Sequence, residues 1–256
     1  MRIWVVLLIV GLVAVLISVL YLIIPREKAK DAYQYSKIKD NLKTGDIILF
    51  SSKNNGNLIQ STIYWTRTRL VGSEYGHVGI VIRTEDGLYL AECCNAMHAG
   101  HDECYHMNKQ GNGGVRIISL DTIIERYHRE YGGFFAVKPI KEELSSDVVI
   151  SSLNKYQESI FEDINFMYYV AMLDTLVSKD IAKTVIRKYR SNMFDPHRMT
   201  CGEFLYNILT DCGVTKSSRS KLVWPHVYVG NRFTKLSNGA YDYHHMFTYD
   251  AEQEST

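Results

Sequence analysis

Short apolar runs separated by turn residues occupy most of this chain after a long apolar run at its N-terminus. Runs of about four to eight residues rich in Val, Ile, Leu and Phe, bounded by Gly, Asp or Pro, are typical of strands. The pattern predicts strands over 47–50, 77–83, 88–92, 115–120 and 134–139. Asp86-Gly87 lies between two of these strands and predicts a tight hairpin turn.

Helical spacing of apolar positions appears between and after the strands. It predicts a helix over 145–161 and another over 202–212, opened by Cys201 and ended by Gly213. Shorter helices are expected over 58–70 and from residue 120, and the aromatic stretch 161–177 is expected to cover the sheet. Short antiparallel strands grouped between helical segments indicate an α+β fold.

The apolar run from Ile3 to Ile24 contains no charged residue and ends at Pro25. A helix of that length, rising 1.5 Å per residue, spans roughly the 30 Å hydrocarbon core of a bilayer. A cleaved signal peptide is the competing interpretation, but the run is longer than the usual apolar region and no small-residue cleavage site precedes Pro25. We therefore expect a transmembrane helix that holds the protein in a lipid bilayer through residues 3–24.

Charge refines the predicted topology and organisation. Only Arg2 precedes the apolar run, whereas several Lys and Arg residues follow Pro25, so the positive-inside rule predicts a single-pass protein with its domain on the cytosolic face, or inside a virion. The net charge of +1 gives no reason to expect nucleic acid as a partner. We expect an anchor over 1–25, a juxtamembrane linker over 26–41, the main domain over 42–235 and a tail over 236–256.

Cys201 and His77 are the candidate nucleophile and base. A thiolate at a helix N-terminus is stabilised by the helix dipole and by unpaired backbone N–H groups, which also suit an oxyanion. An imidazole nearby takes the thiol proton and returns it to a leaving group. The alternative for each residue alone is structural: a small buried hydrophobic cysteine and an ordinary strand histidine.

Glu92 is the candidate for orienting the imidazole. His77 and Glu92 lie near the far ends of one predicted hairpin, on adjacent strands, so their side chains are expected to meet. A carboxylate there fixes the tautomer and stabilises the imidazolium. Taken alone, Glu92 is equally well explained as an exposed glutamate at a strand end, and Glu74 is the next candidate for the same role.

Four segments resemble the circularly permuted branch of the NlpC-type papain-like superfamily, in which YiiX-like bacterial proteins and poxvirus proteins are the nearer relatives and lecithin:retinol acyltransferase is more distant. The segments are Leu42 to Phe50, Gly76 to Val81, Leu90-Ala91-Glu92 and Thr200 to Tyr206, and Pro225 also resembles a proline of that group. The resemblance extends over most of residues 42–230. The N-terminal anchor, an insert around 95–114 and a basic insertion over 178–197 depart from it.

The resemblance implies a papain-like core in permuted order, an antiparallel sheet packed against helices. It implies Cys201 as nucleophile, His77 as base and Glu92 as orienting residue, acting on an amide, ester or thioester carbonyl through an acyl-enzyme, without a cofactor. The substrate is then a peptide or an acylated lipid. The anchored form and the poxvirus-like segments point to a viral protein.

Two other functions compete with a cysteine hydrolase. A lipid acyltransferase of the same fold would use the same three residues. A membrane scaffold is the other alternative: either a non-catalytic protein that keeps the fold, or a zinc-binding module that uses a cluster of soft or borderline ligands whose spacing matches no standard zinc finger. The zinc candidates are Cys93, His98, His101, Cys104 and His106, with Cys94 next to them.

Overall fold

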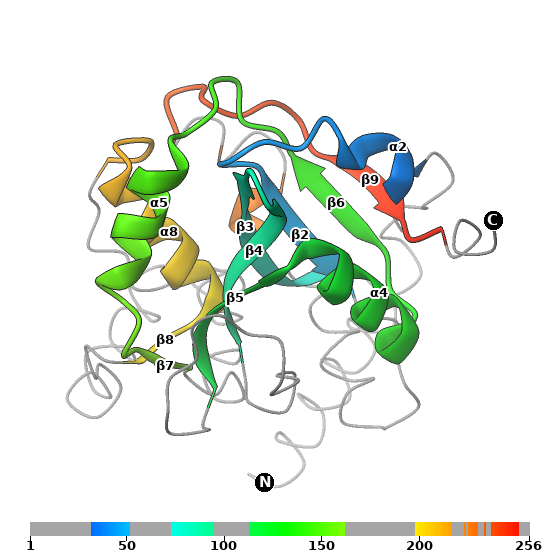
Figure 1. Ribbon diagram of the computed structural model, residues 1–256, viewed down its shortest axis with the longest axis horizontal. Coiled ribbons are helices and arrows are strands. Elements are labelled where there is room, and N and C mark those ends of the chain that lie inside the picture. The colour runs from blue at the N-terminus through cyan, green and yellow to red at the C-terminus, as the bar shows by residue number, and fades with distance from the viewer. Residues whose placement is uncertain are drawn as a thin grey trace, which may run out of the picture.

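A seven-stranded sheet with helices on both faces forms the described part of the protein (Figure 1). The computed structural model describes residues 32–51, 73–94, 113–161, 198–216, 223, 225–229, 233 and 237–250. The strand order is β1-β9-β6-β2-β3-β4-β5. A sheet packed against helices agrees with the mixed class predicted from the sequence.

The central strands lie where the apolar runs predict them. They are β2 (Ile47–Ser51), β3 (Tyr75–Thr84), β4 (Gly87–Cys94), β5 (Gly114–Ser119) and β6 (Phe135–Lys138). Each pairs antiparallel with its neighbours among these five. Every residue of β2 is buried, which explains why its sequence is a continuous apolar run rather than an alternating one.

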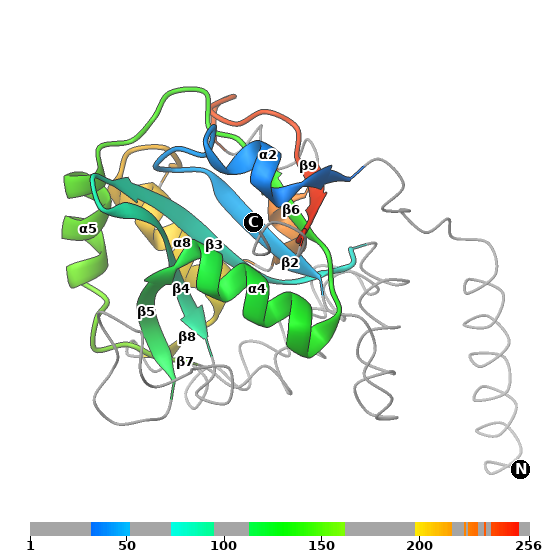
Figure 2. The same ribbon diagram turned by 45° about the vertical axis from the view of Figure 1, so that its right-hand side comes forward.

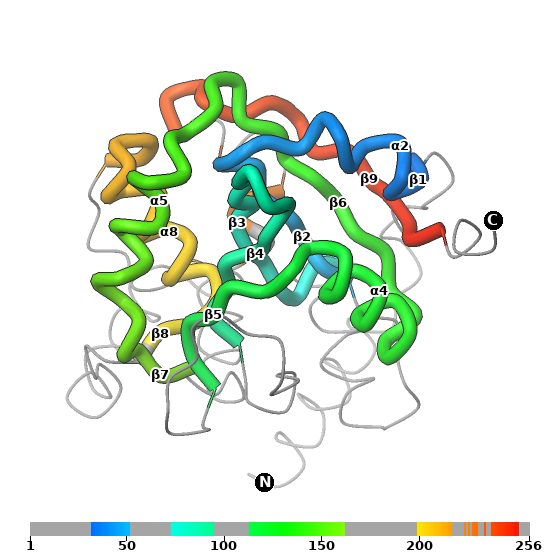
Figure 3. The backbone as a smooth tube through the Cα atoms, in the orientation of Figure 1, coloured from blue at the N-terminus to red at the C-terminus, as the bar shows by residue number. Residues whose placement is uncertain are grey.

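The two outermost strands on the β6 side come from opposite ends of the described chain. β1 (Tyr33–Gln34) pairs parallel with β9 (His245–Thr248), and β9 pairs with β6. Figure 3 shows the N-terminal and C-terminal segments running side by side at this edge. The sequence predicts both segments as a linker and a tail outside the domain, whereas each contributes a strand to the sheet.

Helices divide between the two faces of the sheet (Figure 2). On one face α8 (Cys201–Asp211) and α5 (Ser146–Asn154) pack against side chains such as Leu49 and Ile80. On the other face α2 (Tyr35–Lys39) and α4 (Leu120–Tyr131) pack against Ile48, Phe50 and their neighbours. The sheet is thus buried on both sides, and α8 places its first residue against the sheet.

The turn Thr44-Gly45-Asp46 directly precedes β2 and hydrogen-bonds to segments far away in the sequence. Asp46 accepts hydrogen bonds from the backbone N–H groups of Lys43, at 3.0 Å, and Ile140, at 2.8 Å. Gly45 has a φ of +103°, which favours glycine, and its carbonyl accepts a hydrogen bond from the Tyr241 hydroxyl at 2.7 Å. This part of the Leu42–Phe50 segment therefore stabilises the fold through these hydrogen bonds.

Helix α5 is shorter than its sequence predicts. The apolar spacing predicts a helix to Phe161, but α5 ends at Asn154, and Ile160–Phe161 form β7. The Tyr156 hydroxyl and the Lys155 ammonium both bond the Asp211 carboxylate of α8, at 3.2 and 3.0 Å. Helical spacing alone places Lys155 and Tyr156 within the helix. In the structure they follow its last residue and bond α8 instead.

Two short elements flank α8. β7 pairs parallel with β8 (Arg198–Met199), and the 3-10 helix η4 (Pro225–Tyr228) packs against β3. Among the described residues, no helix is both long and apolar enough to cross a membrane. The predicted anchor at 3–24, the predicted helix at 58–70 and the segments 162–177 and 178–197 lie outside the described residues.

Gly79 lies in β3 where the strand passes close to β4. A Cβ atom there would lie 2.8 Å from Leu90 Cγ and 2.9 Å from the Ala91 carbonyl oxygen, both closer than van der Waals contact. We expect Gly79→Ala to lower the free energy of unfolding by about 1–3 kcal/mol through overpacking, measured by denaturant unfolding. We also expect it to slow alkylation of Cys201, because the shift occurs two residues from His77.

Gly87→Ala is the matched control for Gly79. Gly87 lies at the hairpin turn with a φ of +147°, and no atom lies within 4 Å of a Cβ built there. Its replacement strains the backbone only locally, so stability falls while Cys201 alkylation stays at the parent rate. If Gly79→Ala leaves both the unfolding midpoint and the alkylation rate unchanged, the close contact between β3 and β4 constrains neither the stability of the protein nor the position of His77.

Candidate active site

Cys201 is the first residue of α8 and is only 1% exposed. Thr200 caps the helix: its hydroxyl oxygen accepts a hydrogen bond from the Glu203 backbone N–H at 3.2 Å. The Thr200 carbonyl accepts the first helical bond, from Phe204 N at 2.9 Å. The cap ends the extended segment at Thr200, so Cys201 occupies the first turn, where backbone N–H groups lack helical partners.

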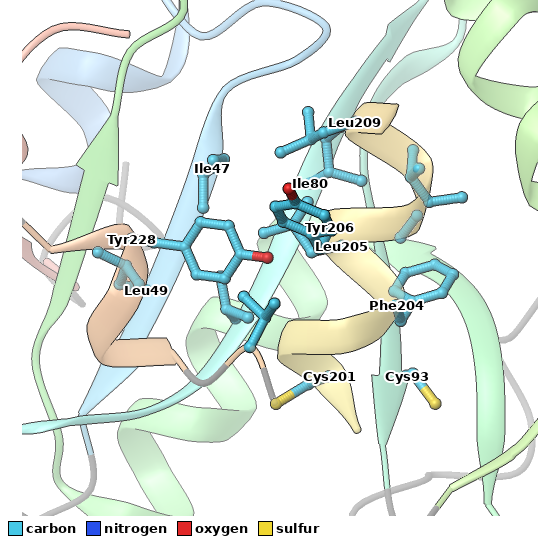
Figure 4. Close-up of a cluster of buried hydrophobic side chains, with 14 of the residues drawn as sticks. Ile47, Leu49, Ile80, Cys93, Cys201, Phe204, Leu205, Tyr206, Leu209 and Tyr228 are labelled. Carbon is cyan, nitrogen blue, oxygen red and sulfur yellow. The ribbon is translucent and has the colours of Figure 1, made fainter. Parts of the chain in front are cut away.

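An apolar cluster and one buried tyrosine fix the position of the first turns of α8, behind Cys201 (Figure 4). Phe204, Leu205 and Leu209 pack into the sheet and are fully buried. The Tyr228 hydroxyl donates to the Gly202 carbonyl oxygen at 2.6 Å, which links η4 to the first turn of α8. The position of the thiol is therefore set by the core as well as by the cap.

The β3–β4 ladder ends close to the candidate base. Its last pair at this end is Ile80 with Ala91. Beyond it His77 is paired with Phe50 of β2, and Glu92 is paired with Arg116 of β5. The side chains of His77 and Glu92 meet beyond the end of the ladder: Nε2 of His77 lies 2.6 Å from Oε2 of Glu92. The contact expected from the hairpin therefore forms.

The Cys201 side chain lies close enough to His77 to influence its imidazole. Because Glu92 takes Nε2, Nδ1 is the ring nitrogen left for the thiol. Burial by itself lowers the pKa of His77, but the Glu92 carboxylate and the Cys201 side chain raise it, and the pKa is raised from 6.5 to about 10. The Phe50 ring packs on the imidazole with centroids 5.4 Å apart, which restricts its rotation.

Arg116 completes the site, and the sequence analysis missed it. Its Nε donates to Oε1 of Glu92 at 2.6 Å and its Nη2 also pairs with Oε1, with both side chains at most 2% exposed. Burial raises the pKa of Glu92, but Arg116 and His77 lower it, and the net pKa falls below its usual range. The available signal was one charged residue inside the apolar run 115–120, the next predicted strand after the hairpin.

Glu74, the second candidate for the orienting group, precedes β3 and is 8% exposed. It is not the partner of the imidazole, since Nε2 of His77 is already bonded to Glu92. The structure thus brings together Cys201, His77 and Glu92, with Arg116 behind them.

The zinc candidates are only partly within the described chain. Cys93 lies under α8, and its thiol donates to the Met199 carbonyl oxygen at 3.5 Å. Burial raises the pKa of Cys93 well above its usual value, and nearby charges raise it further. Figure 4 shows Cys93 and Cys201 at the same end of α8, with their sulfur atoms pointing apart.

The other four zinc candidates, His98, His101, Cys104 and His106, lie outside the described residues. Within the residues that the structure covers, no group of three or more His, Cys, Asp or Glu side chains is arranged to hold a metal ion. The described part of the cluster thus contributes a core thiol.

The chain is similar to one curated viral protein. No protein-family model matches the sequence. The uncharacterized protein R372 of Acanthamoeba polyphaga mimivirus is 34% identical over 202 residues, which cover 79% of this chain and 79% of that protein. The expected viral character agrees with this relative. On that identity and coverage, this chain belongs to the same family as the mimivirus protein R372.

Proposed function

We propose that the protein is a cysteine hydrolase that cleaves an amide, ester or thioester bond through an acyl-enzyme. The observation that carries the proposal is the chain of contacts from the Cys201 thiol at the start of α8, through His77, to the buried Glu92 carboxylate. A nucleophile, a base and a group that orients the base are the three parts that such a reaction needs.

In the first half of the proposed reaction, the Cys201 thiolate attacks the substrate carbonyl carbon. The carbonyl oxygen becomes an oxyanion at the α8 N-terminus, where the first backbone N–H groups have no partner within the helix. The His77 imidazolium then gives its proton to the leaving amine, alcohol or thiol, and the bond to the leaving group breaks. The acyl group stays on Cys201 as a thioester.

In the second half, His77 takes a proton from a water molecule, and the resulting hydroxide attacks the thioester carbonyl. The acid product leaves and the thiolate–imidazolium pair is restored. Glu92 stabilises the imidazolium whenever it forms, and it keeps its own charge because Arg116 lies against it. If an alcohol or amine replaced water in this step, the same residues would carry out acyl transfer.

The test is labelling with a panel of thiol-reactive acyl and peptidyl probes, with Cys201→Ala as the control. We expect at least one probe class to form an adduct at Cys201, and the adduct to be absent from Cys201→Ala. Preference for acyl or peptidyl probes then assigns the substrate class, and product analysis with water or an added alcohol separates hydrolysis from transfer. A panel that labels parent and variant equally would contradict the proposal.

We further propose that residues 3–24 anchor the protein in a bilayer with the domain on the cytosolic face. The support is the uncharged run followed by Lys and Arg residues. Protease added to intact, right-side-out vesicles is expected to leave residues 26–256 undigested until detergent opens the vesicles. Digestion without detergent would instead indicate that the domain lies on the opposite face of the membrane.

A further inference from the structure

We propose that Arg116 is a positioning residue of this site, which acts on His77 and Cys201 through Glu92. The inference rests on the proposed function for its catalytic meaning, but its evidence is the geometry of the buried ion cluster. Arg116 holds one oxygen of the Glu92 carboxylate and His77 holds the other. Arg116 hydrogen-bonds and ion-pairs with Glu92, which in turn bonds His77, so its influence on the imidazole passes through the carboxylate.

Arg116 and His77 bind different oxygens of the Glu92 carboxylate, and this arrangement gives Arg116 a geometric role. Nε of the guanidinium donates a hydrogen bond to Oε1 of Glu92, and Nη2 forms an ion pair with the same oxygen. A planar guanidinium that places two nitrogens against one carboxylate oxygen limits the movement of that oxygen. With Oε1 fixed in this way, Oε2 remains directed at Nε2 of His77, at 2.6 Å. The imidazole is then held with Nδ1 toward the thiol.

The charges of the cluster give Arg116 an electrostatic role. In the reactive state Cys201 is an anion, His77 a cation and Glu92 an anion, so these three groups together carry a net negative charge. Glu92 is 1% and Arg116 2% exposed, and an unbalanced charge at such burial is strongly disfavoured. Arg116 makes the cluster neutral and so allows both the Glu92 carboxylate and the Cys201 thiolate to exist there.

Other groups around the cluster do not replace Arg116 in this role. On its own strand, Glu92 is followed by Cys93, a buried thiol whose pKa is raised. From α4, Tyr131 faces Arg116, and burial raises the pKa of this phenol, so it stays neutral at physiological pH. Among the described neighbours of the Glu92 carboxylate, His77 and Arg116 are therefore the cations, and only Arg116 keeps its charge at every pH of interest.

The test is the pH dependence of Cys201 alkylation by iodoacetamide in the full-length chain, which needs no substrate. In the parent, the rate is expected to stay on its plateau well into the acid range because Glu92 remains ionised. In Arg116→Met, the acid end of the plateau is expected to move up by about one to three pH units, the shift that an adjacent opposite charge typically causes in a carboxyl group. Arg116→Lys, which keeps the charge and loses the fork, is expected to fall between the two.

A double-mutant cycle separates a positioning role from a merely structural one. In the Glu92→Gln background, Arg116→Met is expected to have no further effect on the alkylation profile, because the group through which Arg116 acts is gone. This double variant also leaves no unpaired buried carboxylate, so it is expected to fold where Arg116→Met alone is destabilised. Should Arg116→Met fail to fold, the same cycle is run with Arg116→Lys.

Arg83→Met is the control for general loss of an arginine. Arg83 bonds the Leu42 carbonyl oxygen at 2.7 Å and the Lys39 carbonyl oxygen at 3.1 Å, away from the cluster. Its removal is expected to lower stability without moving the pH profile.

Two results would overturn the inference: an unchanged profile in Arg116→Met or Arg116→Lys, or an undiminished effect of either change in the Glu92→Gln background. Failure of the acyl and peptidyl probes together with a shifted profile would instead refute the proposed function alone.

Discussion

Iodoacetamide is expected to alkylate Cys201 at neutral pH at least about tenfold faster than Cys212, because a thiolate stabilised by a helix N-terminus and an imidazolium outcompetes an ordinary thiol. Exposure alone predicts the opposite order, since Cys201 is 1% exposed whereas Cys212 is partly exposed. Burial and the neighbouring Asp211 raise the pKa of Cys212 and so reduce its thiolate fraction. Mass spectrometry of peptides from a time course of alkylation measures both rates.

Removal of the imidazole identifies the source of this reactivity. His77→Ala is expected to slow Cys201 alkylation at least about tenfold and to leave Cys212 unchanged, because only Cys201 loses its ion-pair partner. The matched control is His245→Ala, which removes an exposed histidine from β9. Equal rates at the two cysteines, with no effect of His77→Ala, would leave Cys201 as an ordinary core thiol.

Glu92→Gln is expected to reduce kcat by ~10²-fold or more, judged by the larger effect of a comparable carboxylate-to-amide change in a serine protease triad. The amide keeps the shape of the side chain but removes its charge, and its NH2 group can present a donor to Nε2 and select the wrong tautomer. Because the imidazolium forms during the reaction, the loss falls on turnover more than on substrate binding. Steady-state kinetics with a cleavable substrate of the same class as the probe that labels Cys201 measures both quantities.

The pH profile of Glu92→Gln gives a second, independent readout. The thiolate–imidazolium pair exists while His77 is protonated and disappears as pH rises through the pKa of His77, which is about 10. The Glu92 charge raises this pKa, whereas burial lowers it, so removing the charge lowers the pKa. The alkaline limb of the activity profile, where the imidazolium is lost as the proton donor, is therefore expected to move to lower pH in Glu92→Gln.

Glu74→Gln is the control for both effects, since Glu74 is a buried glutamate close to His77 in sequence but not its hydrogen-bond partner. It is expected to keep the parent kcat and the parent alkaline limb. A fully active Glu92→Gln together with an inactive Cys201→Ala would reduce the site to a Cys–His dyad.

The central strands and α8 were predictable because their sequence patterns are local. The strands β2 to β6 are short apolar runs between turn residues, and buried strands produce such runs directly. The strands β1 and β9 were missed because each is short and each forms by pairing with a strand far away in the sequence, β1 with β9 and β9 with both β1 and β6. Local periodicity carries no information about such a partner.

The same distinction applies within the site. The His77–Glu92 contact was predictable because one hairpin joins the two residues and its turn sets which strand positions lie side by side. Arg116 was missed because its partner is defined by the register of β4 with β5, and residues 95–113 separate these two strands in the sequence. A lone charge in an apolar run signals burial with a partner but does not say which partner.

By itself the sequence determined the mixed fold class, the five central strands, the helix that begins at Cys201 and the pairing of His77 with Glu92. These depend on hydrophobic period, capping and turn residues, which act over a few positions. Only the tertiary structure decided that the β3–β4 ladder ends near His77, that Arg116 pairs with the buried carboxylate, and that β1 and β9 extend the sheet beyond β6. Each of these depends on burial and on contacts between distant segments, whose free energy exists only once the core has formed.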